Sequence, residues 1–398
     1  MRYRTLLFTL GLLILIVPEI LRVYFIMPFP GSQLHTTIGL AYFLNRSIYF
    51  FRVIGVLLIV VPLYHYWVQG KTREKIFSGI FILLYAFIFY FSNFIARADK
   101  MFVQSRHKTF TSEENNQVDG QDIVIGVSLN GEAKAVPVNI IGYHHQVLDS
   151  VGGQPVMFTY CTVCRSGRAF SPFVNGHYEK FRLVGMDHFN AMFEDGGTRS
   201  WWAQENGEAI AGPLKGQFLA EIPSQQMTLK EWVIDHPHTL ILQPDSEFAA
   251  KYAGLKNYDY GLMKNDLEYT DHNSWQLKSW VVGVTANKKD KAYDWNDLKK
   301  LRMINDTIDK IPVLLVLQED SMSFHTFNRE VNKENLYFEW NNNLKSVVDT
   351  VTHSTWNNKG ECIDGAMKGK QLKPLPSYLE YWHSWKHFHP ATTVYTTH

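Results

Sequence analysis

The residue types best suited to chemistry in this chain lie in one segment, Tyr160-Cys161-Thr162-Val163-Cys164. Two thiols at this spacing can form a structural disulfide, cycle between dithiol and disulfide, or bind a soft metal ion as thiolates. A disulfide across so short a loop restricts the unfolded chain very little, so stabilisation alone is the weakest of the three explanations. We therefore expect Cys161 and Cys164 to form a redox pair or a metal-binding pair.

The residues after the pair predict a turn and then a strand. Residues 165–172 contain both glycine and proline, whereas a thioredoxin-like motif opens a helix. Arg165 and Arg168 would lower the pKa of a neighbouring thiol, but the sequence is equally consistent with two solvated surface charges. The third cysteine, Cys362, is expected to be a lone thiol.

A histidine is the natural third member of such a site. His144 stands 17 residues before Cys161 and would serve as a base or orienting group for a thiol. Alternatively, Cys161, Cys164 and His144 would hold copper(I) or zinc. A second group also offers thioether and imidazole ligands for copper(I), although methionine at strand spacing more often serves packing. Its members are Met186, His188, Asn190 and Met192.

The soluble part of the chain is duplicated. The pattern of Gly, Glu, Ile and Lys over residues 207–216 returns 153 residues later over 360–369. The motif Trp232-x-x-x-His236-Pro237 returns at the same offset as Trp385-x-x-x-His389-Pro390, and upstream positions such as Gly126 and Gly283 are 157 apart. Positions that both copies keep are expected to serve the fold. We assign the repeated Trp to the core and the repeated His-Pro to helix caps.

What only one copy holds is a better guide to function. Gln318 and Ser321 stand where the second copy would have the cysteines, and Leu301 stands in place of His144. The joint loss of these three groups indicates that they act as a unit in the first copy. The second copy is expected to cover the first, or to form one wall of a cleft between them.

The N-terminal quarter is a membrane anchor. Residues 5–26, 47–67 and 76–95 are apolar stretches of about 20 residues, enough to cross a bilayer. No small-residue cleavage site follows the first stretch, so it is a retained span and not a signal peptide. The charges at Glu19, Arg22 and Arg52 are expected to pair with one another or to reach the interface.

Basic residues predict the orientation. Arg2 and Arg4 at the start, with Lys71, Arg73 and Lys75 after the second span, belong on the cytoplasmic side by the positive-inside rule. Three spans then place the soluble region in the periplasm or another extracytoplasmic space. The formal net charge is only +1, so no charge excess points to nucleic acid.

Short β-branched segments separated by turn residues dominate the soluble region. Residues 123–129 and 133–138 flank Asn130-Gly131 and predict a hairpin, 139–151 predict a short helix, and 155–160 predict a strand. The predicted fold is α+β, mainly β, with three transmembrane helices followed by two tandem related repeats. The predicted parts are an anchor (1–97), a linker (98–120), the first repeat (121–245), a connector (246–277) and a degenerate second repeat (278–398).

Several stretches resemble the domain of unknown function 3179 family. Residues 160–167 are similar to its Tyr-Cys-Pro-Leu-Cys-Gly-Ser segment, although Thr162-Val163 and Arg165 replace Pro-Leu and Gly. Residues 133–137, 151–156, 202–214 and 232–240 also match. The family brings no established activity. Some relatives are named as selenoproteins with selenocysteine in this pair, and this resemblance implies redox chemistry.

We predict thiol–disulfide exchange at this pair, with one of Cys161 and Cys164 attacking and the other resolving. A copper or zinc delivery module built on the same residues is the main alternative, and a non-catalytic interaction platform is the third. The expected partners are the lipid bilayer and a thiol-bearing or metal-bearing protein.

Overall fold

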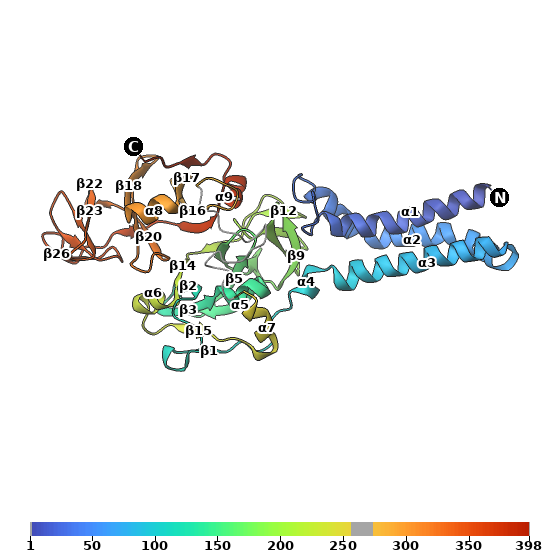
Figure 1. Ribbon diagram of the computed structural model, residues 1–398, viewed down its shortest axis with the longest axis horizontal. Coiled ribbons are helices and arrows are strands. Elements are labelled where there is room, and N and C mark those ends of the chain that lie inside the picture. The colour runs from blue at the N-terminus through green and yellow to red at the C-terminus, as the bar shows by residue number, and fades with distance from the viewer. Residues whose placement is uncertain (1, 256–273, 398) are drawn as a thin grey trace. The chain divides into compact units, whose positions relative to one another are not determined.

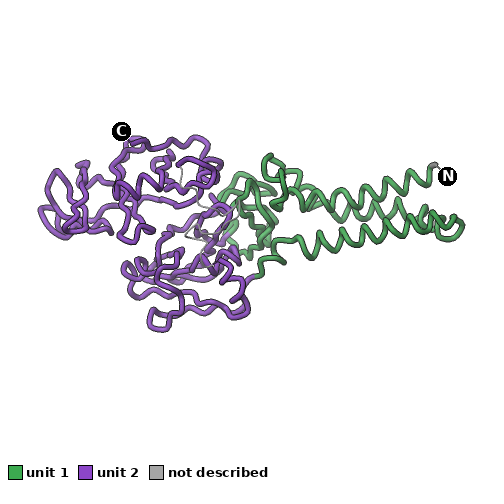
Figure 2. The backbone as a smooth tube through the Cα atoms, in the orientation of Figure 1, with its two compact units in different colours: residues 1–103, 174–203, 207–218 green, residues 104–173, 204–206, 219–398 purple. Residues whose placement is uncertain are grey.

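The computed structural model describes residues 2–255 and 274–397. Two compact units divide the chain. Unit 1 contains residues 1–103, 174–203 and 207–218, and unit 2 contains 104–173, 204–206 and 219–398 (Figure 2). The connector predicted for 246–277 lies in part outside the described residues, and the predicted domain boundaries stay a prediction.

Unit 1 begins with long apolar helices (Figure 1). Three of them are long and apolar enough to cross a membrane, as predicted, and their exposed apolar side chains suit a lipid environment. These elements are α1 (Arg2–Tyr24), α2 (Ile38–Gln69), α3 (Thr72–Tyr90) with the π-helical turn η1 (Phe91–Ile95), and the short α4 (Ala98–Met101).

A buried ion cluster joins these helices. The Glu19 carboxylate is fully buried and contacts Arg22 Nη2 at 2.8 Å and Arg52 Nη2 at 2.6 Å. Asn93, on the π-helical turn, accepts hydrogen bonds from both guanidinium groups. The predicted mutual pairing of these charges is confirmed, and it satisfies groups that would be costly to leave alone in an apolar bundle.

Unit 1 also contains a four-stranded sheet in the order β12-β11-β10-β9. Its strands are β9 (Phe181–Asp187), β10 (Asn190–Asp195), β11 (Trp201–Ala203) and β12 (Ala209–Ala211). Met186 N donates to Ile26 O at 2.8 Å, and Tyr42 of α2 packs edge-on against Trp201 with ring centroids 5.1 Å apart. Within unit 1, this sheet therefore packs against the part of the chain that contains the apolar helices.

Unit 2 holds two pairs of sheets that share one plan. The first pair has the orders β1-β15-β3-β2-β14 and β13-β6-β5-β4, and the second has β28-β16-β17-β29 and β18-β19-β20-β27. The first pair consists of β1 (Phe110–Thr111), β2 (Ile123–Leu129), β3 (Glu132–Pro137), β4 (Gln146–Val151), β5 (Gln154–Cys161), β6 (Ser166–Phe170), β13 (Glu221–Ile222), β14 (Gln225–Thr228) and β15 (Leu240–Leu242).

The second pair consists of β16 (Trp280–Ala286), β17 (Lys289–Asp294), β18 (Met303–Ile308), β19 (Ile311–Leu317), β20 (Phe324–Asn328), β27 (Lys373–Pro374), β28 (Ser377–Tyr381) and β29 (Thr393–Val394). A further sheet contains β23 (Phe338–Asn341), β24 (Ser346–Asp349), β25 (Thr355–Trp356) and β26 (Cys362–Asp364). Two small hairpins are β7 (Phe173–Val174) with β8 (His177–Tyr178), and β21 (Glu330–Val331) with β22 (Glu334–Asn335).

Short helical elements connect these strands. They are η2 (Glu113–Asn115), α5 (Val138–His144), α6 (Leu229–Asp235), η3 (Ser246–Phe248), α7 (Ala249–Ala253), α8 (Trp295–Leu301) and α9 (Trp382–Phe388). With the three apolar helices and the many short strands, they confirm the predicted α+β, mainly β fold.

The duplication is visible in the strand registers. Gly126 pairs with Gln225 in the first repeat, and Gly283 pairs with Tyr378 in the second. Gly126 and Gly283 are 157 residues apart, and Gln225 and Tyr378 are 153 residues apart, so the two pairs are equivalent. Helices α5 and α8, and helices α6 and α9, are also equivalent and equal in length. The two repeats are therefore related copies, as predicted.

The first hairpin is confirmed, but the helix predicted for 139–151 is half wrong. Asn130 and Gly131 have φ angles of 49° and 83°, as a type I′ turn requires. Helix α5 ends at His144 because His145 adopts φ 61°, and residues 146–151 form β4 instead. The apolar residues that suggested a helix are used in antiparallel pairing with β5.

The repeated tryptophans are core residues, as predicted. Trp232 is 1% exposed, and its Nε1 donates to Thr239 Oγ1 at 2.8 Å. Trp385 makes the equivalent bond to Thr392. His236 and His389 cap α6 and α9 and lie against these indole rings, with centroids 3.9 and 3.7 Å apart.

A glycine faces each indole ring. A Cβ atom at Gly126 would clash with Trp232, and one at Gly283 would clash with Trp385.

We predict that Gly126→Ala destabilises the protein by about 1–3 kcal/mol because the strand cannot move away from the ring. Thermal unfolding of the detergent-purified chain measures this. Gly120→Ala is the control, since its Cβ would lie 3.6 Å from Lys230 in ordinary contact. Equal melting of both variants would refute the packing argument.

Candidate functional site at the CxxC loop

The cysteine pair lies on a tight hairpin loop of the first repeat. Strand β5 ends at Cys161, strand β6 begins at Ser166, and the residues between them form a turn in which Arg165 has φ 57°. The predicted turn and strand are confirmed. A reversal of this size holds residues three apart within about 7 Å, which matches the Cα separation of a disulfide.

The second repeat covers this loop. Tyr381 N donates to Cys164 O at 2.9 Å, and His383 Nε2 lies 3.1 Å from Val163 O. The Arg165 guanidinium stacks on the Trp280 ring at 3.6 Å from its centroid. Both cysteines are buried as a result, with 1% of Cys161 and 0% of Cys164 exposed.

The contact is reciprocal. Tyr381 is the N-cap of α9, and its equivalent, Thr228, is the N-cap of α6. Thr228 N donates to Ser323 Oγ at 3.0 Å. Ser323 directly follows the loop of the second repeat that is equivalent to the CxxC loop. Each repeat therefore presents a hairpin loop to the helix start of the other, but only one of these loops carries cysteines.

His383 was not predicted from the sequence. Burial lowers its pKa to about 4, so the ring is neutral and its Nε2–H donates to the Val163 carbonyl. Lys230 stands at the equivalent position of the first repeat. The sequence signal for this residue is that only the second copy holds a histidine at this position.

The predicted histidine has a well-defined partner. His144 is the last residue of α5, and its Nε2 lies 2.7 Å from Tyr252 Oη. Its ring also packs edge-on against Phe248, with centroids 5.0 Å apart. His145 is the histidine attached to the cysteine strand, since its Nδ1 lies 2.9 Å from Tyr160 O. Burial lowers the pKa of His145 to about 4, which keeps it neutral.

The comparison with protein families covers most of the chain that follows the apolar helices. Residues 104–392 match the family described as protein of unknown function DUF3179. The chain belongs to the DUF3179 family. The matched residues include the CxxC loop, the first repeat and most of the second, which confirms the resemblance stated above. No curated protein and no solved structure matches the chain.

A second group of charged residues lies next to the loop in this DUF3179 protein. Arg168, four residues after Cys164 on β6, is 2% exposed, so it is not a solvated surface charge. Its Nη2 contacts Glu205 Oε1 at 2.8 Å and Glu380 Oε1 at 2.7 Å, and its guanidinium stacks on the Tyr378 ring at 3.6 Å. One cation thus binds two buried carboxylates, one from each repeat.

His389 extends this cluster. Its Nε2 lies 3.2 Å from Glu205 Oε1, and its Nδ1 lies 3.0 Å from Asp290 Oδ2. Burial opposes the charged form of His389, but Glu205, Glu380 and Asp290 together raise its pKa to about 9. Burial raises the pKa of Glu380, whereas His389 and Arg168 overcome burial at Glu205 and lower its pKa.

The predicted metal ligands Cys161, Cys164 and His144 belong to no cluster of potential ligands among the described residues. Within residues 2–255 and 274–397, no group of three or more His, Cys, Asp and Glu side chains is arranged to hold a metal ion. The group of Met186, His188, Asn190 and Met192 lies on β9, β10 and the turn between them in unit 1, where Met192 is fully buried, as packing requires. Cys362 is a buried thiol on β26, and its Sγ lies 3.3 Å from Asp364 O.

We predict that the charge of His389 stabilises the fold at neutral and acidic pH. Its pKa in the folded protein lies above the ordinary value of about 6.5. The contribution is therefore complete below pH 6.5 and is lost as the pH rises through about 9. His389→Gln should cost on the order of 3 kcal/mol more at pH 6 than at pH 10, measured by denaturant unfolding.

His236→Gln is the matched control at the equivalent position. Burial lowers the pKa of His236, so the stability linked to it is lost as the pH falls below the ordinary value. The difference between wild type and this variant should therefore shrink toward acidic pH. Identical pH profiles for the two variants would contradict the assignment of the Glu205–His389 ion pair.

Proposed function

We propose that this DUF3179 protein is a membrane-anchored thiol–disulfide exchange protein whose active pair is Cys161 and Cys164. The observation that carries the proposal is the asymmetry between two equivalent loops. Both loops meet a helix start of the opposite repeat, but only the first holds thiols. A loop needed only for docking would not require them, since the second loop docks with Asp320 and Ser323.

The reaction we propose is a two-step exchange. One thiolate of the pair attacks a disulfide of the substrate, forming a mixed disulfide and releasing one substrate thiolate. The second cysteine of the pair then attacks the mixed disulfide. The pair ends as a disulfide and has lost two electrons and two protons, while the substrate gains both and ends as a dithiol. The reverse direction oxidises a substrate dithiol.

We propose that a nearby positive charge stabilises the reactive thiolate. Arg165 lies in the loop itself, and its guanidinium contacts an aromatic ring, so its charge acts in surroundings of low dielectric constant. The charge of Arg168 is instead balanced by Glu205 and Glu380. We therefore assign thiolate stabilisation to Arg165. We propose that His144 is an orienting group. Because His144 is hydrogen-bonded to Tyr252, the variant Tyr252→Phe tests that role directly.

Burial of both cysteines limits access to them. A bulky protein disulfide reaches the pair only if the loop leaves the second repeat, which breaks the contacts to Tyr381 and His383. A small disulfide needs a smaller opening. We propose the extracytoplasmic side for this chemistry because the basic residues flanking the spans favour it, and because disulfides persist there.

The proposal predicts a reversible two-electron couple. The detergent-purified chain, equilibrated in glutathione buffers and alkylated, should convert two of its three thiols to a disulfide between about −300 and −120 mV. Cys161→Ser and Cys164→Ser should each abolish the couple, whereas Cys362→Ser should not change it.

Arg165→Gln should raise the pKa of the reactive thiol and slow its alkylation by iodoacetamide at pH 7. Lys333→Gln, an exposed site in the second repeat, is the control for the loss of one charge. A potential below about −300 mV would assign the pair to a structural disulfide. Stoichiometric bound zinc or copper that is lost in Cys161→Ser would instead support metal delivery.

A further inference from the structure

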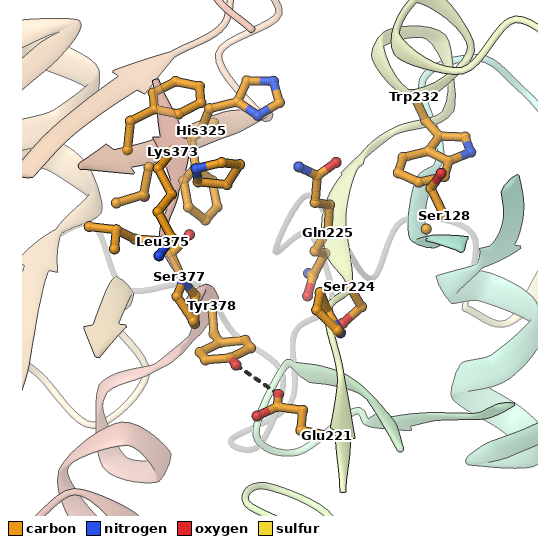
Figure 3. A pocket seen from close by; sticks show the side chains of 18 of the residues that line it. Ser128, Glu221, Ser224, Gln225, Trp232, His325, Lys373, Leu375, Ser377 and Tyr378 are labelled. Atoms are coloured by element: carbon orange, nitrogen blue, oxygen red, sulfur yellow. Dashed lines mark hydrogen bonds between the residues drawn. The ribbon is translucent and has the colours of Figure 1, made fainter. Parts of the chain in front are cut away.

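A cavity of about 560 Å³ lies between the two repeats within unit 2. One wall comes from β14 and the residues before it, and the opposite wall comes from β20, β27 and β28. Figure 3 shows Ser224 and Gln225 on one side and Ser377 and Tyr378 on the other. Tyr378 Oη donates to Glu221 at 2.7 Å at one end of the cavity. Its volume falls in the range of small-molecule sites.

The duplication gives this cavity an equivalent elsewhere in the interface. At the offsets of 157 and 153, His325 corresponds to Arg168, Gln225 to Tyr378, and Met227 to Glu380. In the other half of the interface, Arg168, Tyr378 and Glu380 are packed together. The Arg168 guanidinium lies between two carboxylates and stacks on Tyr378. The region around Arg168 is therefore filled by the Arg168 ion pairs, whereas the equivalent region around His325 is open.

The open position contains polar groups that are suited to a ligand. Within the described residues, Thr326 Oγ1 and Gln226 Nε2 are buried and have no hydrogen-bond partner. Thr326 is only 3% exposed, and both residues line the cavity. A buried polar group without a partner is costly, so a bound acceptor would be favoured here.

The charges of the lining favour an acid over a base. Lys373 contributes an ammonium group, and Glu221, the only carboxylate among the described lining residues, already accepts a hydrogen bond from Tyr378. Of the two histidines, His325 faces Asp235 at 3.4 Å and His236 stacks on Trp232. Much of the remaining wall is apolar and is formed by Phe324, Phe327, Leu375, Pro223, Pro374 and Pro376.

We propose that this cavity binds a small organic acid with an apolar body. The carboxylate accepts hydrogen bonds from the buried donors and faces Lys373, and the apolar body packs on the phenylalanine and proline side chains. The site is separate from the cysteine pair, and the proposal does not depend on thiol chemistry.

Two ligands with the same body and opposite charges test the proposal. Full-length protein in detergent is titrated by calorimetry with 3-phenylpropionate and with 3-phenylpropylamine. We expect the acid to bind with a Kd below about 1 mM and the amine to bind at least 10-fold more weakly. Absence of acid binding, or equal binding of the amine, overturns the proposal.

Two variants locate the site. His325→Arg introduces the side chain that fills the equivalent position, and it should weaken acid binding at least 10-fold by occupying the cavity. Asn342→Arg adds the same charge at an exposed site of the second repeat and should leave binding unchanged. A Kd for His325→Arg equal to that of wild type overturns the proposal.

Thr326→Val covers the case in which His325→Arg fails to fold. This substitution keeps the shape and removes the hydroxyl, so acid binding should weaken about 3-fold to 10-fold. The same titration of Cys161→Ser should give the wild-type Kd. Failure of the thiol proposal therefore leaves this proposal intact, and unchanged binding in Thr326→Val refutes it.

Discussion

Arg168 carries a positive charge into the interior of unit 2, and the contact between the two repeats depends on how that charge is satisfied. The guanidinium is removed from water, which is costly unless anions replace the solvent. Glu205 from the first repeat and Glu380 from the second supply those anions, and His389 shares Glu205. Separation of the repeats would break the Arg168–Glu380 and His389–Glu205 ion pairs and leave Glu380 without its cation, so the cluster selects one arrangement of the two repeats.

That arrangement decides where the cysteines lie. Arg168 is on β6, the strand that leaves the CxxC loop, and Glu380 is on β28, immediately before Tyr381. Arg168 lies four residues after Cys164, and Glu380 directly precedes Tyr381, so the ion pair and the hydrogen bond from Tyr381 to Cys164 are close together in both segments. A change that weakens the ion cluster should also loosen the cover over the thiols. The stability of the interface and the accessibility of the pair are linked through two neighbouring strands.

The sequence was informative where a signal was local or repeated. The Asn130-Gly131 turn, the core tryptophans and the position of the cysteines on a hairpin followed from turn chemistry and from the comparison of copies. It failed at residues 146–151, because a single left-handed residue, His145, ends the helix and long-range pairing with β5 then decides the structure.

The partners of the site were harder to foresee. His383 lies 220 residues from Val163 of the loop, and Glu380 lies 212 residues from Arg168 on β6, and no local pattern connects them. They can be recognised only once it is known that each repeat packs against the loop of the other. Cys362 shows the limit of that approach, since it is unique to the second copy and is simply buried on β26.

Duplication explains how one interface can hold two different arrangements of side chains. Two related repeats that dock reciprocally create every contact region twice, and the fold needs only one strong set of contacts to stay closed. In this chain the Arg168 cluster provides that set, which leaves the region around His325 free to keep smaller side chains and an open volume. The same reasoning applies to the loops, where Asp320 and Ser323 dock without thiols while Cys161 and Cys164 are retained on the other side. The chemistry of a duplicated protein should therefore be sought where equivalent positions have diverged in size, charge or nucleophilicity.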